Sequence, residues 1–444
     1  GAQRIGATIV PLNPLYKPAE ISFILNDCAA KAAITVGLFY PALQAARAEL
    51  PNLQHAIVAS GEDLPGALPW RSTFGTMSKE PPPPVTIAPD DVAVICYTSG
   101  TTGKPKGAML TQDNFISNCA QMNSAQRVAL TSDDIVWLGL PLFHIYAMNV
   151  GMNVAVMIGA TMVLMERFEP AAAFDMIQKH HVTAVHGAPP MYVAWANLPN
   201  VRDYDLSSLR YCGSGAAALP VKVLEDFKAA TGVDITEGYG LTEAAPVVTT
   251  NAAGPFSKPG SIGIPIADVE IRLVNPDTGQ DVPIGEIGEL WCRGPNVMAG
   301  YYNRPDANAT TLGDGWLHTG DLATMDSDGY YYIVDRLKDM IVVSGYNVYP
   351  REVEEVLFRH PAVAEAAVVQ VPDAYQGESV FAFVVLKPGQ TAAESDIIEF
   401  ARANMAVFKA PKRVAFKEAL PKNNTGKVLH RELRDDARQI VTQV

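Results

Sequence analysis

Short apolar runs alternate with helix-length segments along the first half of the chain. Because parallel strands need a crossover connection, which is usually a helix, this alternation predicts parallel β-sheets flanked by helices. We therefore expect an α/β fold here. The expected strands are Ala7–Val10, Ala32–Val36, Asp91–Tyr97, Thr161–Met165, Thr183–His186 and Leu209–Cys212, and the first expected helix is Lys17–Ala30.

Two later changes of pattern predict further units. From about Gly260 the strands and turn signals are closely spaced, which is typical of a β-rich subdomain. After Asp339 strands and helices alternate again, which predicts a small α+β domain. We therefore expect a large N-terminal domain over residues 1–337 and a C-terminal domain over residues 338–444. The expected elements of the latter are strands Ile341–Val343, Ala364–Val371 and Val380–Val385 and helices Pro350–Phe358 and Glu394–Met405.

Composition excludes several classes of protein. The 444 residues carry 34 Lys and Arg against 47 Asp and Glu, a net charge of −13, so we expect no nucleic-acid partner. The five cysteines are odd in number and never approach C-x-x-C spacing, which excludes a thiolate zinc cluster and favours a cytoplasmic protein. We expect no signal peptide.

The segment from Ile145 to Met165 has no charged residue and is long enough to cross a membrane. Asn149, Gly151 and Gly159 interrupt it, however. We therefore predict a buried helix followed by a buried strand, and no transmembrane segment.

The strand before Thr98 leads into a loop that is rich in glycine and hydroxyl groups, Tyr97-Thr-Ser-Gly-Thr-Thr-Gly-Lys-Pro-Lys-Gly107. Glycines let backbone N–H groups turn towards an anion, and hydroxyls and lysines add further donors. The run predicts a polyphosphate site. It is not a Walker A loop, because Pro105 stands where that loop has its hydroxyl residue.

The loop resembles the signature of the adenylate-forming superfamily, which includes acyl-CoA synthetases, luciferases and peptide-synthetase adenylation domains. Further family motifs follow in the family's order, at Tyr239–Glu243, Gly315–Asp321, Asp335–Asp339 and Pro421–Lys427. The resemblance covers essentially the whole chain. The family has an additional N-terminal stretch, so the resemblance implies that the first subdomain is incomplete here.

The resemblance implies a nucleotide site for ATP and AMP. An alternative for Gly213-x-Gly215-x-x-Ala218 is a dinucleotide loop, but a lone match of this kind is weak. The implied nucleotide residues are Thr98, Ser99, Gly100, Thr101, Thr102, Gly103, Lys106, Gly213, Gly215, Ala216, Glu237, Gly238, Tyr239, Gly240, Thr242, Asp321, Arg336 and Lys427.

The same resemblance implies the catalytic groups. Lys427 would bridge the acyl oxygen and the α-phosphate, Thr242 would support that phosphate, and His144 would lie near the acyl carboxylate. Glu243 and Thr98 would hold Mg²⁺. A histidine packed in the core is the competing interpretation of His144.

The later half-reaction is assigned by resemblance too. The C-terminal domain would turn about a hinge at Lys338 and bring a coenzyme A passage to the site. The residues implied for that passage are Ser344, Gly345 and Tyr346.

The acid is the least constrained substrate. The candidate acyl-pocket residues are mostly small or apolar, which favours an apolar tail and disfavours amino acids. They are His144, Tyr146, Met148, Gly187, Ala188, Gly213 and Ala244.

We expect a cytoplasmic, AMP-forming acyl-CoA ligase for medium- or long-chain fatty acids. The alternatives are an aryl or hydroxycinnamate-CoA ligase, an adenylation enzyme that loads a carrier protein and, less favoured, a luciferase-like oxygenase. Peripheral membrane association and a homodimer are kept open.

Overall fold

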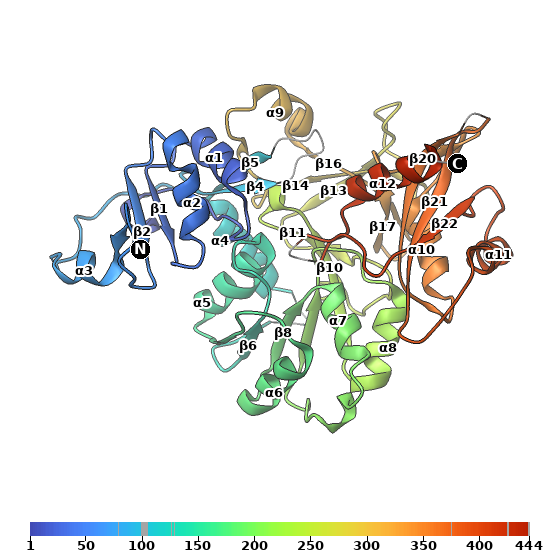
Figure 1. Ribbon diagram of the computed structural model, residues 1–444, viewed down its shortest axis with the longest axis horizontal. Helices are drawn as coiled ribbons and strands as arrows, with labels where there is room; N and C mark the ends of the chain where they lie inside the picture. The colour runs from blue at the N-terminus through green and yellow to red at the C-terminus, as the bar shows by residue number, and fades with distance from the viewer. Residues whose placement is uncertain are drawn as a thin grey trace. The chain divides into compact units, whose positions relative to one another are not determined.

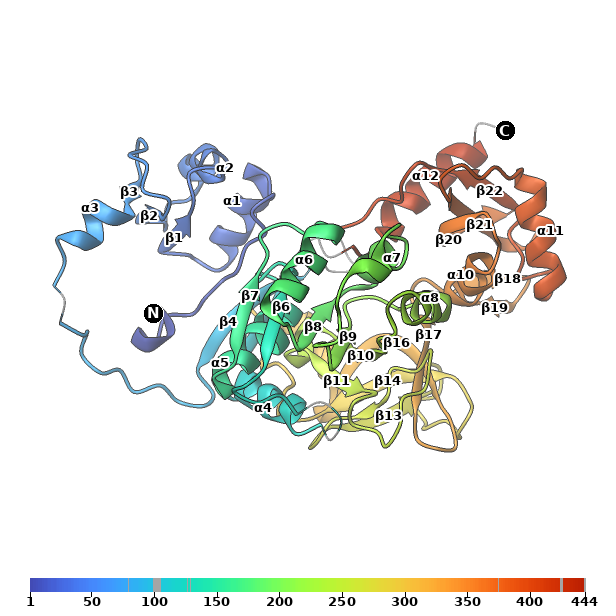
Figure 2. The same cartoon turned by 90° about the horizontal axis from the view of Figure 1, so that it is seen from below.

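The computed structural model describes residues 1–78, 80–98, 105–125, 127, 129–373, 375–423 and 426–442. It contains two compact units (Figures 1 and 2). Unit 1 comprises Gly1–Phe115 and Met298–Ala309, and unit 2 comprises Ile116–Val297 and Thr310–Val444.

Unit 1 begins with a small parallel sheet in the order β1-β2-β3. The strands are β1 (Ala32–Thr35), β2 (His55–Val58) and β3 (Leu68–Pro69), and the first helix, α1 (Pro18–Asp27), packs with them through Ile21 and Leu25. The strand expected at Ala7–Val10 is reduced to one bridge, between Ile9 and Val94.

A second sheet of unit 1 corrects the expectation of parallel strands. β4 (Val92–Thr98), β5 (Lys106–Thr111) and β15 (Gly300–Tyr301) form an antiparallel sheet in the order β15-β5-β4. Ala93, Val94, Ile95 and Cys96 are all buried, so β4 has the continuous apolar run that is usual for a parallel strand. An apolar run indicates that a strand is buried on both faces, but it does not indicate whether the strand pairs in parallel or antiparallel fashion.

The main sheet of unit 2 has seven strands in the order β12-β11-β10-β9-β8-β6-β7. The five from β10 to β7 are parallel; β7, β8 and β9 were expected strands and β6 and β10 were not predicted, and β11 and β12 are antiparallel additions at one edge. Their bounds are β6 (Ile135–Leu138), β7 (Thr161–Leu164), β8 (Ala184–Gly187), β9 (Tyr211–Ser214), β10 (Ile235–Gly240), β11 (Val247–Thr250) and β12 (Ile264–Pro265).

Alternation along the strands directs side chains to two helical layers, which Figure 2 shows on either side of β6 and β8. On one face, an aromatic cluster around Trp195 joins β6 to the helices α6 (Pro170–His180), α7 (Pro189–Ala196) and α8 (Val221–Thr231). On the other face, Leu138 approaches Gly151 of the next helical segment.

That segment is the uncharged stretch of the sequence. It forms the π-helix η3 (Tyr146–Asn153), the short helix α5 (Val154–Ile158) and then β7. Within the described residues, no helix has the length and apolar character that a membrane span requires. The strand is less buried than predicted: β7 lies at the sheet edge, and Leu164 is 57% exposed.

The β-rich subdomain is present as an antiparallel sheet in the order β13-β14-β16-β17. Its strands are β13 (Glu270–Val274), β14 (Gly288–Arg293), β16 (Leu317–Met325) and β17 (Tyr331–Arg336). In the pairing of β16 with β17, Asp321 stands opposite Arg336.

The end of the chain forms a further sheet, in the order β19-β18-β21-β20, with β22 beside β21. Along β21, Val380, Ala382 and Val384 face the core beneath α10 and α11, whereas Phe381 and Phe383 pack with α12. The domain boundary near Lys338 stays a prediction. The elements are β18 (Ile341–Val343), β19 (Tyr346–Val348), α10 (Pro350–Phe358), β20 (Val363–Asp373), β21 (Gly377–Leu386), α11 (Glu394–Asn404), β22 (Arg413–Phe416) and α12 (His430–Thr442).

Trp195 is the centre of the aromatic layer, so its truncation tests this account of the packing. Its ring is 1% exposed and stacks on Phe174 at 5.2 Å, and its Nε1 donates to the Pro170 carbonyl oxygen at 3.1 Å. We expect Trp195→Ala to lower the free energy of unfolding by roughly 3–5 kcal/mol in urea titrations. Tyr375→Ala, at a side chain that is 98% exposed, should change it by less than about 0.5 kcal/mol. Equal effects would contradict the account.

Candidate active site

Unit 1 contributes the two ends of the predicted phosphate loop. Thr98 ends β4 and Lys106 begins β5, and the two residues are register partners. The Lys106 ammonium lies 4.4 Å from the centre of the Tyr301 ring. The antiparallel pair therefore brings Thr98 and Lys106 side by side. Ser99, Gly100, Thr101, Thr102 and Gly103 lie outside the described residues.

In unit 2, the turn after β9 carries three predicted nucleotide residues. Gly213 is in β9, and the Gly215 N–H donates to the Gly187 carbonyl oxygen at 3.2 Å, which ties this turn to the end of β8. Ala216 has a left-handed backbone with φ of 71°. The carboxyl ends of parallel strands β8 and β9 thus meet where ligands bind in open α/β sheets.

Tyr239, Asp321 and Arg336 form one hydrogen-bonded group. The Tyr239 hydroxyl donates to Asp321 Oδ2 at 2.6 Å, and Arg336 Nε lies 3.5 Å from Asp321 Oδ1. Burial and the Asp321 carboxylate raise the pKa of Tyr239 well above its usual value, so its hydroxyl stays protonated. Tyr239 and Asp321, both predicted nucleotide residues, are therefore neighbours.

The predicted Thr242–Glu243 pair stands on a tight turn. Thr242 begins the single turn η5 (Thr242–Ala244), directly after β10, and both residues are partly exposed. A side chain at Gly240 would meet the Pro246 carbonyl oxygen at 2.1 Å, so the chain passes too closely for any larger residue. Gly238, one position before Tyr239 in the same strand, pairs with Thr250 of β11.

Three buried asparagines, which the sequence analysis missed, hold the far side of this turn. Asn149 Nδ2 donates to the Ala245 carbonyl oxygen at 2.6 Å, and Asn296 Nδ2 donates to that of Ala244 at 2.9 Å. Asn118 both donates to the Val247 carbonyl and accepts from its N–H. Backbone groups that lack regular partners are thereby satisfied, which fixes the position of Glu243.

Lys427 lies on a tight turn close to the sheet. Its N–H donates to Asn423 Oδ1 at 2.9 Å, and Lys422 and Val428 form a bridge across the turn. Gly426 has φ of 82°, and a side chain there would meet Pro190 Cγ at 2.5 Å. Only glycine meets both conditions. The turn is therefore seated against the start of α7, next to the end of β8.

The charges around Lys427 are mixed. The pKa of Lys427 is lowered to about 8, mainly by loss of hydration; Arg336 and Lys338 act in the same direction, while Asp321 and Asp339 oppose them. Its ammonium also acts on His144, whose pKa falls to about 4, mainly through burial. Lys427 thus interacts electrostatically with His144 and with the Asp321–Arg336 pair, which come from distant parts of the sequence. At neutral pH the lysine is charged and the histidine is neutral.

Lys338, the predicted hinge, is an exposed residue whose charge acts on the same cluster. Desolvation lowers its pKa. Asp339, the next residue, is 5% exposed and pairs with Arg434 of α12 at 2.5 Å. The link from β17 to the C-terminal sheet is therefore tied down by an ion pair in this conformation.

Glu237 is a buried carboxyl group of β10 with 3% exposure. Among the described residues, its Oε2 has no hydrogen-bond partner. Burial raises its pKa to about 7, although Arg351 acts in the opposite direction. Its carbonyl oxygen accepts from the Asn251 N–H at 2.9 Å.

The residues assigned to coenzyme A lie at the tip of a hairpin. Ser344 and Gly345 both have positive φ, 51° and 84°, and join β18 to β19 in a two-residue turn of the type that hairpins favour. Tyr346 is 62% exposed and packs on Phe408. The tip is thus exposed, and the Ser344 N–H donates to the Gln376 carbonyl oxygen at 2.8 Å.

The predicted acyl-pocket residues line a region filled by aromatic rings. A side chain at Gly213 would meet the Tyr211 hydroxyl at 2.5 Å, and one at Gly187 would meet the Tyr192 ring at 3.0 Å. Tyr146 lies against Gly215 in the same way. Met148, Ala188 and Ala244, which are also predicted pocket residues, are buried.

The sequence analysis also missed His186 of β8. Its ring packs edge-on against Tyr146 and Tyr211. The one signal in the sequence that could have identified it was its position in an apolar strand, directly before the predicted pocket residue Gly187.

Two family models match this chain. The model described as AMP-binding enzyme matches residues 1–302, and the model of the AMP-binding enzyme C-terminal domain matches residues 352–427. The first match covers more than half of the chain. The chain belongs to the AMP-binding enzyme family. The resemblance to adenylate-forming enzymes and the expected fold class are thereby confirmed.

Individual relatives of this AMP-binding enzyme have different acids in their names. It is 38% identical to the long-chain-fatty-acid–CoA ligase of Bacillus subtilis, over 97% of this chain and 81% of that protein. It is 39% identical to 4-coumarate–CoA ligase 2 of Solanum tuberosum, over 98% and 80%. The ATP-bound structure of MatB from Rhodopseudomonas palustris matches with a TM-score of 0.89 and 31% identity, over 99% and 85%.

The pKa of Glu237 leads to a prediction about stability. A carboxyl group whose pKa rises from 4.5 to about 7 on folding stabilises the protein below pH 4.5, and this contribution is lost as the pH rises through 7. Glu237→Gln cannot ionise, so it should be more stable than the parent at pH 8, by roughly 3 kcal/mol, and differ less at pH 5. Urea unfolding of the two proteins at pH 5 and at pH 8 measures this difference in stability. Glu225→Gln, at an exposed position of α8, should show no such pH-dependent gain.

Proposed function

We propose that this chain is an ATP-dependent, AMP-forming acyl-CoA ligase, in which Lys427 is the principal catalytic group. A carboxylate would attack the α-phosphate of ATP, giving an acyl-adenylate and pyrophosphate, and the thiol of coenzyme A would then displace AMP. Membership of the family and the CoA ligases among the relatives support the class of reaction. The observation that carries the assignment is the position of the Lys427 ammonium beside His144 and the Asp321–Arg336 pair.

The first step requires positive charge rather than a base. A carboxylate is already ionised at pH 7, and the barrier comes from bringing it towards a polyanion. Lys427 would contact the acyl oxygen and the α-phosphate, where negative charge concentrates in the transition state. His144, neutral at this pH, can donate one hydrogen bond to the incoming carboxylate without adding a charge.

Nucleotide recognition is divided among several elements. Asp321 would accept from the ribose hydroxyls while its other contacts to Tyr239 and Arg336 hold it in place. The Thr242 hydroxyl would support the α-phosphate. Thr98 and Lys106, at the ends of the predicted phosphate loop, would contribute a hydroxyl and a charge to the other phosphates.

The donor set suits a magnesium ion bound with ATP. Mg²⁺ prefers carboxylate and hydroxyl oxygens and keeps several waters, and Glu243 offers a partly exposed carboxylate on a turn that the three asparagines fix. Glu243, with Thr98 as a second donor, would hold the ion. When bound, it would neutralise phosphate charge.

For the second step, we propose that residues 338–444 turn about Lys338. The motion would withdraw Lys427 and bring the Ser344–Gly345 turn to the acyl-adenylate, where the lack of a side chain at Gly345 would let the pantetheine arm pass close to the backbone. The exposed position of this turn in the present structure fits the first half-reaction, before such a motion. The Asp339–Arg434 ion pair lies directly after the hinge.

The acyl substrate was expected to be a medium- or long-chain fatty acid, with aryl acids as the alternative. The aromatic lining around Tyr146 favours a compact acid over a long flexible chain, and we therefore raise the aryl alternative to equal rank. A carrier protein as acceptor stays a third alternative.

The test is pyrophosphate release from ATP over a panel of acids, namely acetate, octanoate, palmitate, benzoate and 4-coumarate, each with and without coenzyme A. We expect a thioester and AMP with at least one acid. Pyrophosphate release without any thioester would indicate a carrier-protein acceptor, and no release with any acid would contradict the proposal.

Lys427→Ala should separate the two half-reactions. We expect the rate of acyl-adenylate formation to fall roughly 100-fold or more, because the developing charge loses its main partner. The conversion of supplied acyl-adenylate to thioester should persist. Lys422→Ala is the matched control from the same turn, since Lys422 instead pairs with Glu365 at 2.5 Å. Equal losses in the two variants, or loss of both half-reactions in Lys427→Ala, would refute the role of Lys427.

A further inference from the structure

His186 is a buried histidine with unused hydrogen-bonding capacity. It is 2% exposed at the end of β8, and neither ring nitrogen has a hydrogen-bond partner among the described residues. A neutral imidazole has one donor and one acceptor. Buried polar groups are almost always paired with protein, water or ligand, so this pair of nitrogens calls for a partner that is not part of the chain.

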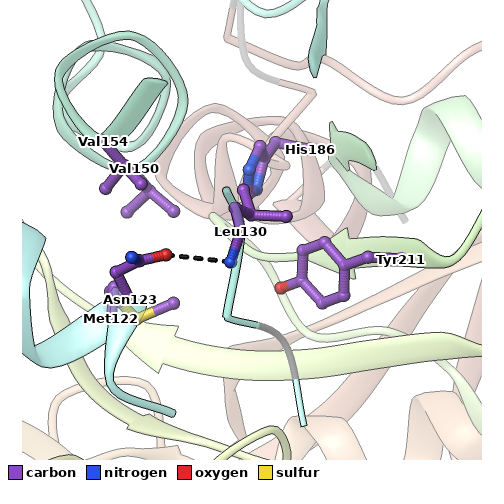
Figure 3. A pocket seen from close by; sticks show the side chains of 7 residues that line it. All are labelled: Met122, Asn123, Leu130, Val150, Val154, His186 and Tyr211. Carbon is purple, nitrogen blue, oxygen red and sulfur yellow. Dashed lines mark hydrogen bonds between the residues drawn. The ribbon is translucent and has the colours of Figure 1, made fainter. Parts of the chain in front are cut away.

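The imidazole faces a small cavity (Figure 3). Met122, Leu130, Val150 and Val154 give it apolar walls, and the Tyr211 ring stands edge-on to His186 at 5.5 Å. The one amide in the lining, that of Asn123, already accepts from the Leu130 N–H at 2.9 Å. The cavity volume is about 10 Å³, close to the space that one water molecule needs.

Tyr146 connects the cavity to the candidate site. The Tyr146 N–H donates to His144 Nδ1 at 3.3 Å, and the Tyr146 ring stands edge-on to His186 at 5.8 Å. His144 in turn feels the charge of Lys427. His186 is thus one aromatic ring further from the reacting carboxylate than His144, next to the predicted pocket residue Gly187. This is where the tail of a bound acid would end.

We propose that His186 recognises a hydroxyl group on the tail of the carboxylic acid, so that hydroxylated acids are preferred over their unsubstituted analogues. This inference rests on the proposed ligase function and narrows its substrate. A hydroxyl both donates and accepts one hydrogen bond, as a neutral imidazole does, and is about the size of one water molecule. The tail of a phenolic acid and that of an ω-hydroxy fatty acid both carry this group.

A charged tail group fits less well. Among the described residues, no carboxylate, lysine or arginine lines the cavity, and burial holds the pKa of His186 at about 4, which keeps the ring uncharged at pH 7. An ammonium or a second carboxylate would therefore be buried without a counter-charge. An apolar tail would leave both nitrogens unpaired.

The experiment compares matched pairs of acids, 4-coumarate with cinnamate and 10-hydroxydecanoate with decanoate. For each pair we would measure the ratio of kcat/KM for thioester formation and the ratio of dissociation constants by calorimetry. We expect the hydroxylated acid of at least one pair to be preferred about tenfold or more, and the pair that responds identifies a phenolic or an alkyl tail.

Substitutions of His186 then test whether this residue causes the preference for the hydroxylated acid. His186→Phe keeps an aromatic ring without polar atoms, so the ratio should fall to near one while the thermal midpoint stays the same or rises. His186→Leu repeats the test if the larger ring does not fit. His180→Phe, at an exposed helix end, should leave the ratio unchanged.

Several results would overturn the proposal. These are equal use of both acids by the parent protein, as expected if a water molecule alone pairs with His186, a preference that persists in His186→Phe, or one that disappears only in Tyr211→Phe. If no acid gives a thioester, the ligase function fails, whereas the calorimetric ratios still decide the role of His186.

Discussion

The ammonium group of Lys427, held partly out of water, is the constraint around which the candidate site is arranged. Two carboxylates, Asp321 and Asp339, act to keep it charged, and each is itself paired with an arginine, Arg336 and Arg434. The group therefore keeps positive charge, and within the part of the chain that the structure describes it forms no direct ion pair. Such a charge is available to an incoming anion, which is what the adenylation of a carboxylate requires.

Hydrogen bonds and close packing hold the two turns that carry Glu243 and Lys427 in place. The turn that carries Glu243 is irregular, and Asn118, Asn149 and Asn296 satisfy its backbone groups from three different elements. The turn that carries Lys427 depends instead on close contact, since Gly426 fits against Pro190 without room for a side chain. Polar groups in the interior thus do structural work at the one place where the sheet cannot supply partners.

Much of this could be predicted from the sequence, because the informative residues stand in local patterns. The motif residues Tyr239, Asp321 and Lys427 were identified as candidate site residues, and three of the five parallel strands of the main sheet, β7, β8 and β9, were expected from the alternating pattern. The antiparallel pairing of β4 was not predicted, because an apolar run is the same in parallel and antiparallel strands. The asparagines and His186 were missed for another reason. Single polar residues within apolar segments form no pattern, and their partners, such as Val247 for Asn118, lie far away in sequence.

The relatives leave the acid open, and the site explains why. In the proposed site, the groups assigned to the nucleotide and the carboxylate are separate from those assigned to the tail, so one arrangement of Lys427, His144 and Asp321 would serve fatty and aryl acids alike. The proposal leaves the tail to Tyr146, His186 and their neighbours, where small changes would alter the substrate without affecting the chemistry.

The most direct measurement follows the oxygen atoms of the acid. If the carboxylate attacks the α-phosphate and the thiol then attacks the acyl carbon, one carboxylate oxygen must leave with AMP. With an acid labelled with oxygen-18 at its carboxylate, mass spectrometry should find one labelled oxygen in AMP and none in pyrophosphate. Unlabelled AMP formed together with thioester would contradict the account.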